Sequence, residues 1–140
     1  MITPHTMVPR PDELDVEFYK ATVAANALCI QRCQECGTWT HPARYYCPNC
    51  FSGKFAFEKM SGRATIHSYT VTHFTVEPAW KPFLPYVTIV AELEEGPRIV
   101  ASAKGMDPEQ VAIGSSIRIV TENKSPEFAI FWAESGKGEG

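Results

Sequence analysis

The chain has 140 residues, a formal net charge of −3 and a hydrophobic share of 44%. That length fits one ordinary domain or two small ones, and that hydrophobic share is normal for a globular protein and argues against disorder. The acidic balance disfavours proteins that hold nucleic acid mainly through its phosphates, because those proteins carry a basic surplus. Nine glycines and eleven prolines indicate many turns and short elements, which favours β structure over a helical bundle.

Neither a signal peptide nor a membrane span is expected. Residues 1–10 lack a continuous apolar core, and no stretch of the chain approaches the roughly 20 apolar residues that a span requires. We therefore expect a soluble, cytoplasmic protein. Thiols stay reduced in that compartment, so clustered cysteines are better explained as metal ligands than as disulfides.

An extended arm with three prolines, residues 1–11, precedes a predicted helix at residues 12–28. Asp12 can cap this helix through its carboxylate. Apolar residues then recur at spacings of four, three, four and three, and so share one face: Leu14, Phe18, Ala21, Ala25 and Leu28. That face covers either the β domain of the protein itself, the ordinary arrangement, or a groove of a partner. In the second case Phe18 and Tyr19 would be the anchors.

Two Cys-x2-Cys pairs, separated by ten residues, follow the helix: Cys33, Cys36, Cys47 and Cys50. Each two-residue gap lets a tight turn direct two thiolates at one cation, and Gly37 permits the positive φ that such turns require. The spacing predicts a rubredoxin-like zinc ribbon, with iron as the main rival metal. A hairpin between residues 38–40 and 44–46 is expected within the spacer.

The metal is expected to be structural rather than catalytic. A catalytic zinc keeps one position open for water, whereas four thiolates fill the tetrahedron. A segment of roughly 25 residues cannot bury enough apolar surface to fold alone, so metal binding supplies the missing free energy.

After the ribbon, the pattern changes to alternating, β-branched and aromatic segments that predict five strands near residues 65–73, 86–93, 98–103, 116–121 and 128–132. A helical turn is expected at residues 107–111, between the third and fourth strands. This plan matches an OB-fold barrel, although other five-stranded barrels would give the same pattern. The expected organisation is therefore mainly β and has four parts: an arm and helix (1–28), a zinc ribbon (29–55), an OB-fold domain (56–135) and a flexible tail (136–140).

The remaining reactive side chains do not form a catalytic set. Cys29 lies between two apolar residues, a setting that disfavours the thiolate and indicates core packing. His67 and His73 share one face of the first predicted strand, where a structural role is the more common one. His41 lies in the ribbon turn, where four cysteines already satisfy the metal. No carboxylate pair, phosphate loop or nucleophile elbow is present, so we expect no catalytic residue and no enzyme activity.

A loop stiffened by three prolines, at residues 77–85, carries large apolar side chains: Trp80, Phe83, Leu84 and, just after it, Tyr86. Such side chains are good contact anchors for a partner because they lose little entropy on binding. The alternative is that the rings fold back over the mouth of the barrel.

The order of these parts resembles the zinc-ribbon/OB-fold acyl-CoA-associated proteins, a family long catalogued as a domain of unknown function. The resemblance covers residues 16–132 and includes motifs at residues 61–64 (SGRA), 68–71 (SYTV), 85–87 (PYV) and 92–98 (ELEEGPR). Two positions depart from the family pattern. Phe51 stands where a glycine often follows the last ligand, and residues 41–44 read His-Pro-Ala-Arg instead of Pro-Pro-x-Arg.

The resemblance implies a non-catalytic subunit that completes a thiolase-superfamily enzyme, whether a thiolase, an aldolase or an acyltransferase. It also implies a place in acyl-CoA metabolism, such as lipid or steroid degradation, with coenzyme A held in some members at the partner interface. No motif fixes residues that contact coenzyme A. The competing class is a single-stranded nucleic-acid binder, because OB barrels and zinc ribbons both occur there. Its groove would be lined by basic residues: Lys54, Lys59, Arg63, Arg98, Lys104 and Arg118.

Overall fold

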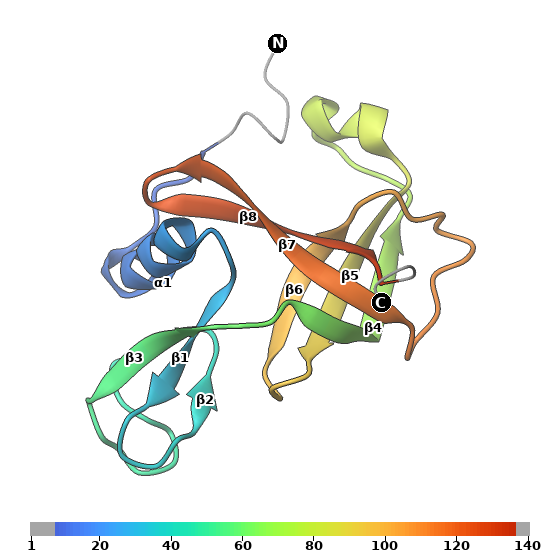
Figure 1. Ribbon diagram of the computed structural model, residues 1–140. Coiled ribbons are helices and arrows are strands. Elements are labelled where there is room, and N and C mark those ends of the chain that lie inside the picture. Colours follow the sequence, from blue (N-terminus) through green and yellow to red (C-terminus); the bar gives the residue numbers. More distant parts are fainter. Residues whose placement is uncertain (1–7, 137–140) are drawn as a thin grey trace.

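The computed structural model describes residues 8–136. The predicted arm at residues 1–7 and most of the predicted tail, residues 137–140, lie outside the described residues. Figure 1 shows three connected parts: a helix, a small three-stranded sheet at one end and a five-stranded barrel. None of the helices within residues 8–136 is long and apolar enough to cross a membrane.

Helix α1 (Glu13–Ala25) begins as the sequence predicts. The Asp12 carboxylate accepts hydrogen bonds from two backbone N–H groups of the first turn, at 3.0 and 2.9 Å, and so satisfies two donors that the helix leaves unpaired. The helix ends at Ala25 rather than at the predicted Leu28, because Asn26 adopts a left-handed conformation with φ 51° and closes the last turn. Leu28 leaves the helix but is still buried.

The ribbon sheet consists of β2 (Trp39–Thr40), β1 (Cys29–Cys33) and β3 (Phe55–Lys59), in that order. Both outer strands are antiparallel to β1. Strand β3 comes after the second pair of cysteines and returns to pair with all five residues of β1. The sheet therefore extends to Lys59, and the predicted domain boundary between residues 55 and 56 falls inside β3.

The predicted hairpin between residues 38–40 and 44–46 is wrong. Strand β2 pairs with β1, and residues 44–46 form no strand. The physical reason is a competing partner for the backbone of Arg44. The buried side chain of Gln31 accepts a hydrogen bond from the Arg44 N–H (2.8 Å) and donates one to the Arg44 carbonyl (2.6 Å).

The second half of the chain is a closed barrel with the strand order β4-β5-β6-β8-β7. Its strands are β4 (Arg63–Thr72), β5 (Tyr86–Leu93), β6 (Arg98–Ala103), β7 (Ser116–Ser125) and β8 (Phe128–Ser135). All neighbours are antiparallel except β6 and β8, which are parallel. This five-stranded closure, with the last strand inserted between the third and fourth, is the predicted OB-fold.

Two connections of the barrel contain short helical segments. The proline-rich loop, for which no helix was predicted, contains a 3-10 helix, η1 (Pro78–Phe83), in which the Glu77 carboxylate accepts a hydrogen bond from the Ala79 N–H at 3.2 Å. The single turn expected at residues 107–111 is present, with the Gln110 N–H donating to the Asp107 carbonyl at 2.9 Å.

Helix α1 lies between the ribbon sheet and the far ends of β7 and β8, and it joins the two (Figure 1). Phe18, at 4% exposure, sits at the centre of this junction. Its ring centroid lies 5.1 Å from His41 and 6.4 Å from Phe57, both in the ribbon, and 5.8 Å from Phe131 in β8. Of the two expected positions for the apolar face of the helix, the structure shows the one on the protein's own domains.

Candidate metal centre and neighbouring surfaces

The four predicted metal ligands come together. All four sulfur atoms lie within 4.8 Å of one another. The Cys33 and Cys50 sulfurs are 3.5 Å apart, and the Cys36 and Cys47 sulfurs are 3.6 Å apart. A tetrahedral zinc with Zn–S bonds of about 2.3 Å requires sulfur–sulfur distances of about 3.8 Å. The donor set and its spacing therefore fit a zinc ion held by four thiolates.

Two similar turns present these ligands. In the first turn the Gly37 N–H donates to the Cys33 carbonyl at 3.0 Å, and in the second the Phe51 N–H donates to the Cys47 carbonyl at 2.9 Å. Gly37 has φ 79° and Phe51 has φ 64°, both in the left-handed region. The expectation of a positive φ at Gly37 is confirmed. Phe51 holds the same conformation in the second turn despite its side chain.

Backbone N–H groups point at the sulfurs as they do at bound thiolates. Cys33 Sγ accepts from the backbone N–H groups of Glu35 (3.4 Å) and Cys36 (3.5 Å), and Cys47 Sγ accepts from that of Asn49 (3.4 Å). Because hydrogen bonds to the charged form favour it, each turn is built to stabilise negative sulfur.

The thiols differ in how easily they ionise. Hydrogen bonds from the Thr38 hydroxyl, and then from the Asn49 amide, lower the pKa of Cys36 to about 5. The Ser52 backbone N–H also lowers the pKa of Cys50, but desolvation and hydrogen bonds to the neighbouring thiols outweigh it and raise that pKa to about 12. Cys36 and Cys50 thus do not ionise together by themselves, whereas a central divalent cation would stabilise both thiolates.

Comparisons with known proteins agree with this geometry. Family models match two adjacent parts of the chain: the ChsH2 rubredoxin-like zinc ribbon domain over residues 23–56 and the ChsH2 C-terminal OB-fold domain over residues 57–122. A DUF35 domain-containing scaffold protein from Methanocaldococcus jannaschii is 40% identical over 111 residues, which are 78% of this chain and 77% of that protein. The chain belongs to the DUF35 family.

Two further similarities are to a subunit of an enzyme and to a chain of a solved complex. A probable enoyl-CoA hydratase alpha subunit of Thermomonospora curvata is 32% identical over 128 residues, or 91% of this chain. The chain spans only 40% of the length of that relative. Among solved structures, a chain of the Ltp2-ChsH2(DUF35) aldolase superposes with a TM-score of 0.79 at 29% identity, covering 92% of this chain and 99% of that one.

The predicted contact residues on the helix face inward. Phe18 is buried at the junction described above, and Tyr19 is half-buried against Phe128, at a ring-centroid distance of 4.8 Å. In this structure Phe18 therefore packs within the chain, and its ring is not a surface feature. Burial also raises the pKa of Tyr19, and the nearby Asp15 adds to the effect.

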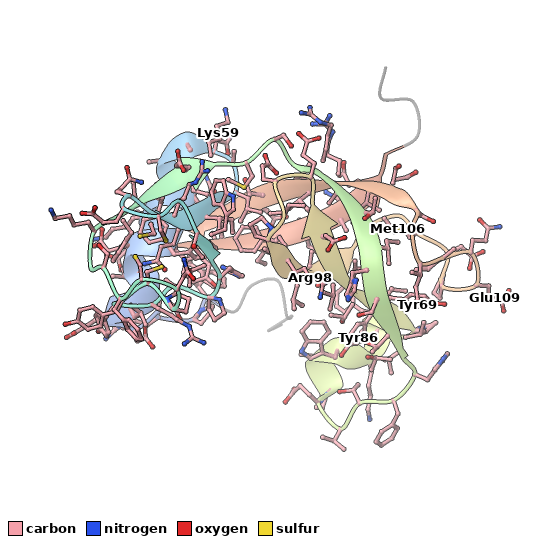
Figure 2. All side chains as sticks on the ribbon, turned by 90° about the horizontal axis from the view of Figure 1, so that it is seen from below. Lys59, Tyr69, Tyr86, Arg98, Met106 and Glu109 are labelled. Atoms are coloured by element: carbon pink, nitrogen blue, oxygen red, sulfur yellow. The ribbon has the colours of Figure 1, made fainter. Side chains whose placement is uncertain are left out.

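The predicted contact residues near the proline-rich loop gather at the opposite end of the molecule, where Figure 2 labels Tyr86 beside η1. The Trp80 ring centroid lies 5.0 Å from that of Tyr86 and 6.5 Å from that of Phe83. These three rings line a recess of about 270 Å³, together with Lys104 and other residues that sequence reasoning missed: Met106, Pro108 and Trp132. The missed residues come from β8 and the β6–β7 connection, which no local signal places beside η1. Leu84, half-buried, does not line the recess.

Of the remaining candidate residues, Cys29 packs in the core and the two histidines lie at the surface. The buried Cys29 thiol lies 3.6 Å from the backbone carbonyls of Ala21 and Ala27, and burial raises its pKa, as expected for a packed residue. His67 and His73 are both exposed, and β4 ends one residue before His73.

Half of the cations expected to line a nucleic-acid groove are neutralised by carboxylates. Arg63 pairs with Glu94, Arg98 with Glu92 at 3.2 Å, and Lys54 with Glu35 at 3.5 Å. Counterion release needs cations that are available to phosphates. These ion pairs therefore disfavour the binding of single-stranded nucleic acid by this set of cations.

Proposed function

We propose that this protein is a non-catalytic scaffold subunit of an enzyme complex in acyl-CoA metabolism, and that its partner is a thiolase-superfamily enzyme. The observation that carries the proposal is the similarity to one chain of the Ltp2-ChsH2(DUF35) aldolase, which extends over 99% of that chain. The names of the relatives, a scaffold protein and an alpha subunit of an enoyl-CoA hydratase, support the same setting.

The chemistry of the metal centre supports a structural role. Four thiolates complete a tetrahedral zinc and leave no position for water or substrate, so the ion acts as a cross-link between the two cysteine turns. In the proposed complex the reacting groups belong to the partner, and this chain supplies shape and stability.

The aromatic recess supports a contribution to coenzyme A binding at the partner interface. Trp80, Tyr86 and Trp132 offer ring faces on which an adenine can stack, and the Lys104 ammonium lies 5.7 Å from the centroid of the Trp132 ring. A lysine beside an aromatic face suits the phosphates that accompany that base. We expect the cytoplasm as the compartment, because none of the five cysteines forms a disulfide.

The test of the partner is affinity purification of the tagged chain from its native host, with mass spectrometry of the eluate. A thiolase-fold enzyme in stoichiometric amount, still bound after size-exclusion chromatography, would support the proposal. Recovery of nucleic acid, or of the chain alone, would contradict it. Cys36→Ser is the negative control, because it removes a metal ligand and should release the partner together with the zinc.

The test of the recess is calorimetric titration of coenzyme A into the purified complex. Trp80→Ala should weaken coenzyme A binding about tenfold with little change in Tm, because one stacking face is worth roughly 1–3 kcal/mol. Val100→Ala, at an exposed apolar residue of β6 outside the recess, is the control and should leave the affinity unchanged. A large loss of Tm with unchanged affinity would instead show that the Trp80 ring is a lid over the barrel.

A further inference from the structure

Four large aromatic side chains are exposed within the eleven residues 45–55 of the zinc ribbon. Tyr45 is 60% exposed, Tyr46 66%, Phe51 78% and Phe55 36%. Tyr46 and Phe55 line one shallow recess with Cys47 and Ser52, so these two aromatic side chains lie close together. We refer to the four exposed residues as the ribbon aromatic face. The zinc ribbon that carries them lies at the end of the molecule opposite η1 (Figures 1 and 2).

We propose that the ribbon aromatic face is a docking surface for the thiolase-fold partner, and that it binds an apolar patch bordered by carboxylates. This inference rests on the proposed function and adds to it the surface that makes the contact. Three observations carry it: the backbone conformation of Phe51, the rigid support of the loop and the charge beside it.

Neither the backbone conformation at position 51 nor packing within the chain favours a phenylalanine there. Its φ of 64° lies in the region that favours glycine, and the equivalent residue of the first turn is Gly37. A side chain kept in a strained conformation normally gains from contacts that outweigh the strain. At 78% exposure the Phe51 ring has few such contacts within the chain, so the gain must come from another molecule.

The loop is held at its start and in its middle. At its start, the buried Gln31 side chain makes two hydrogen bonds to the backbone of Arg44, immediately before Tyr45. In its middle, between Tyr46 and Phe55, the Cys47 N–H donates to the Ser52 carbonyl at 2.8 Å, and Cys47 is one of the four clustered cysteines. Aromatic rings presented by a preorganised loop lose little entropy on binding, which is the property of an interface anchor.

The charge beside the face indicates the border of the partner surface. Two other cations of the ribbon are already paired, Arg32 with Glu58 at 3.4 Å and Lys54 with Glu35 at 3.5 Å. Arg44, at the start of the loop, forms no ion pair within residues 8–136. A single available guanidinium next to exposed rings complements an apolar patch with carboxylates at its edge. Lys59, the other unpaired cation of the ribbon sheet within this range, lies at the opposite end of β3 from Phe55, and two separate cations are too few for a nucleic-acid groove.

The decisive variant is Phe51→Gly, because it should change the stability of the chain and its affinity for the partner in opposite directions. Relief of the strain should raise the Tm of the isolated chain by about 3 °C with zinc retained. Loss of the ring should weaken binding to the thiolase-fold enzyme that co-purifies with the wild-type chain by at least about tenfold. Surface plasmon resonance gives the affinity, and a zinc assay gives the metal content.

Two further variants sharpen the test. Tyr45→Ala should also weaken binding about tenfold without altering a strained position, and Arg44→Glu should slow association and remove part of its salt dependence. Ile113→Ala, at a position 69% exposed in the β6–β7 connection, is the matched control and should bind like the wild type.

The outcomes separate this inference from the proposed function. If the wild-type chain recovers no thiolase-fold enzyme, or recovers nucleic acid, both are overturned. If the wild-type chain binds such an enzyme and both Phe51→Gly and Tyr45→Ala bind it with unchanged affinity, only the docking surface is overturned. Weaker binding by these two variants, with zinc content and fold intact, supports the surface.

Discussion

Replacing Phe18 by alanine should loosen the junction that joins the ribbon to the barrel. The ring is 4% exposed and contacts aromatic rings from both parts, so no single neighbour can collapse into the space it leaves. Phe→Ala changes in such positions cost about 3–5 kcal/mol. Alanine is the better helix former, so intrinsic helix propensity partly opposes this loss.

For a chain of this size that cost corresponds to a fall in Tm of roughly 10 °C. Urea unfolding followed by tryptophan fluorescence and circular dichroism measures the free energy, and a chromogenic chelator measures the rate of zinc release. Release should become faster, because α1 packs directly on the ribbon strands β1 and β3.

Leu14→Ala is the matched control on the same helix. Leu14 is only partly buried against the core, so its truncation should cost clearly less than that of Phe18. A Phe18→Ala protein that loses less than about 1 kcal/mol, or no more than Leu14→Ala, would refute the role of Phe18 as the junction.

Three further predictions concern the metal, a buried hydrogen bond and pH. Cys36→Ser should abolish stoichiometric zinc binding and unfold the ribbon while the barrel keeps its β-sheet circular dichroism; full zinc content with native Tm would refute this. Thr22→Val should destabilise the chain by about 1–3 kcal/mol in urea, more than Thr22→Ser, because the buried Cys29 N–H loses its acceptor at 3.2 Å. Burial lowers the pKa of His41 below its ordinary 6.5, although Asp15 partly offsets this. The unfolded state therefore takes up the proton first, and the stability from the neutral ring is lost as pH falls below about 6.5. Between pH 7.5 and 5.5 the free energy of unfolding of His41→Gln should accordingly fall less than that of the wild type. Parallel pH dependences of the two proteins would show that His41 does not contribute.

Local signals in the sequence were enough for the elements whose causes are local. The Asp12 cap, the positive φ at Gly37 and the two Cys-x2-Cys turns each depend on residues within a few positions of one another. The five strands of the barrel also follow from their own β-branched and alternating residues, and β5 alternates between half-buried and buried side chains without interruption.

The pairing of the ribbon strands could not be predicted in the same way. Residues 38–40 and 44–46 are close in the sequence and suggested a hairpin, but the Gln31 side chain takes the backbone groups of Arg44 that a strand would need. Strand β3 begins more than twenty residues after β1 ends, and it pairs with β1 beside a cluster of four cysteines that come from both sides of that gap.

The four clustered cysteines, the β class and the helix start can all be read from short segments of the chain, because capping, metal geometry and the two-residue period act over short distances. Tertiary structure alone decided which surfaces are accessible. It buries Phe18 between two parts of the chain, gathers Trp80 with Trp132 in one recess, and leaves Phe51 exposed in a strained conformation. Burial depends on contacts between residues far apart in the chain, and no local pattern specifies these contacts.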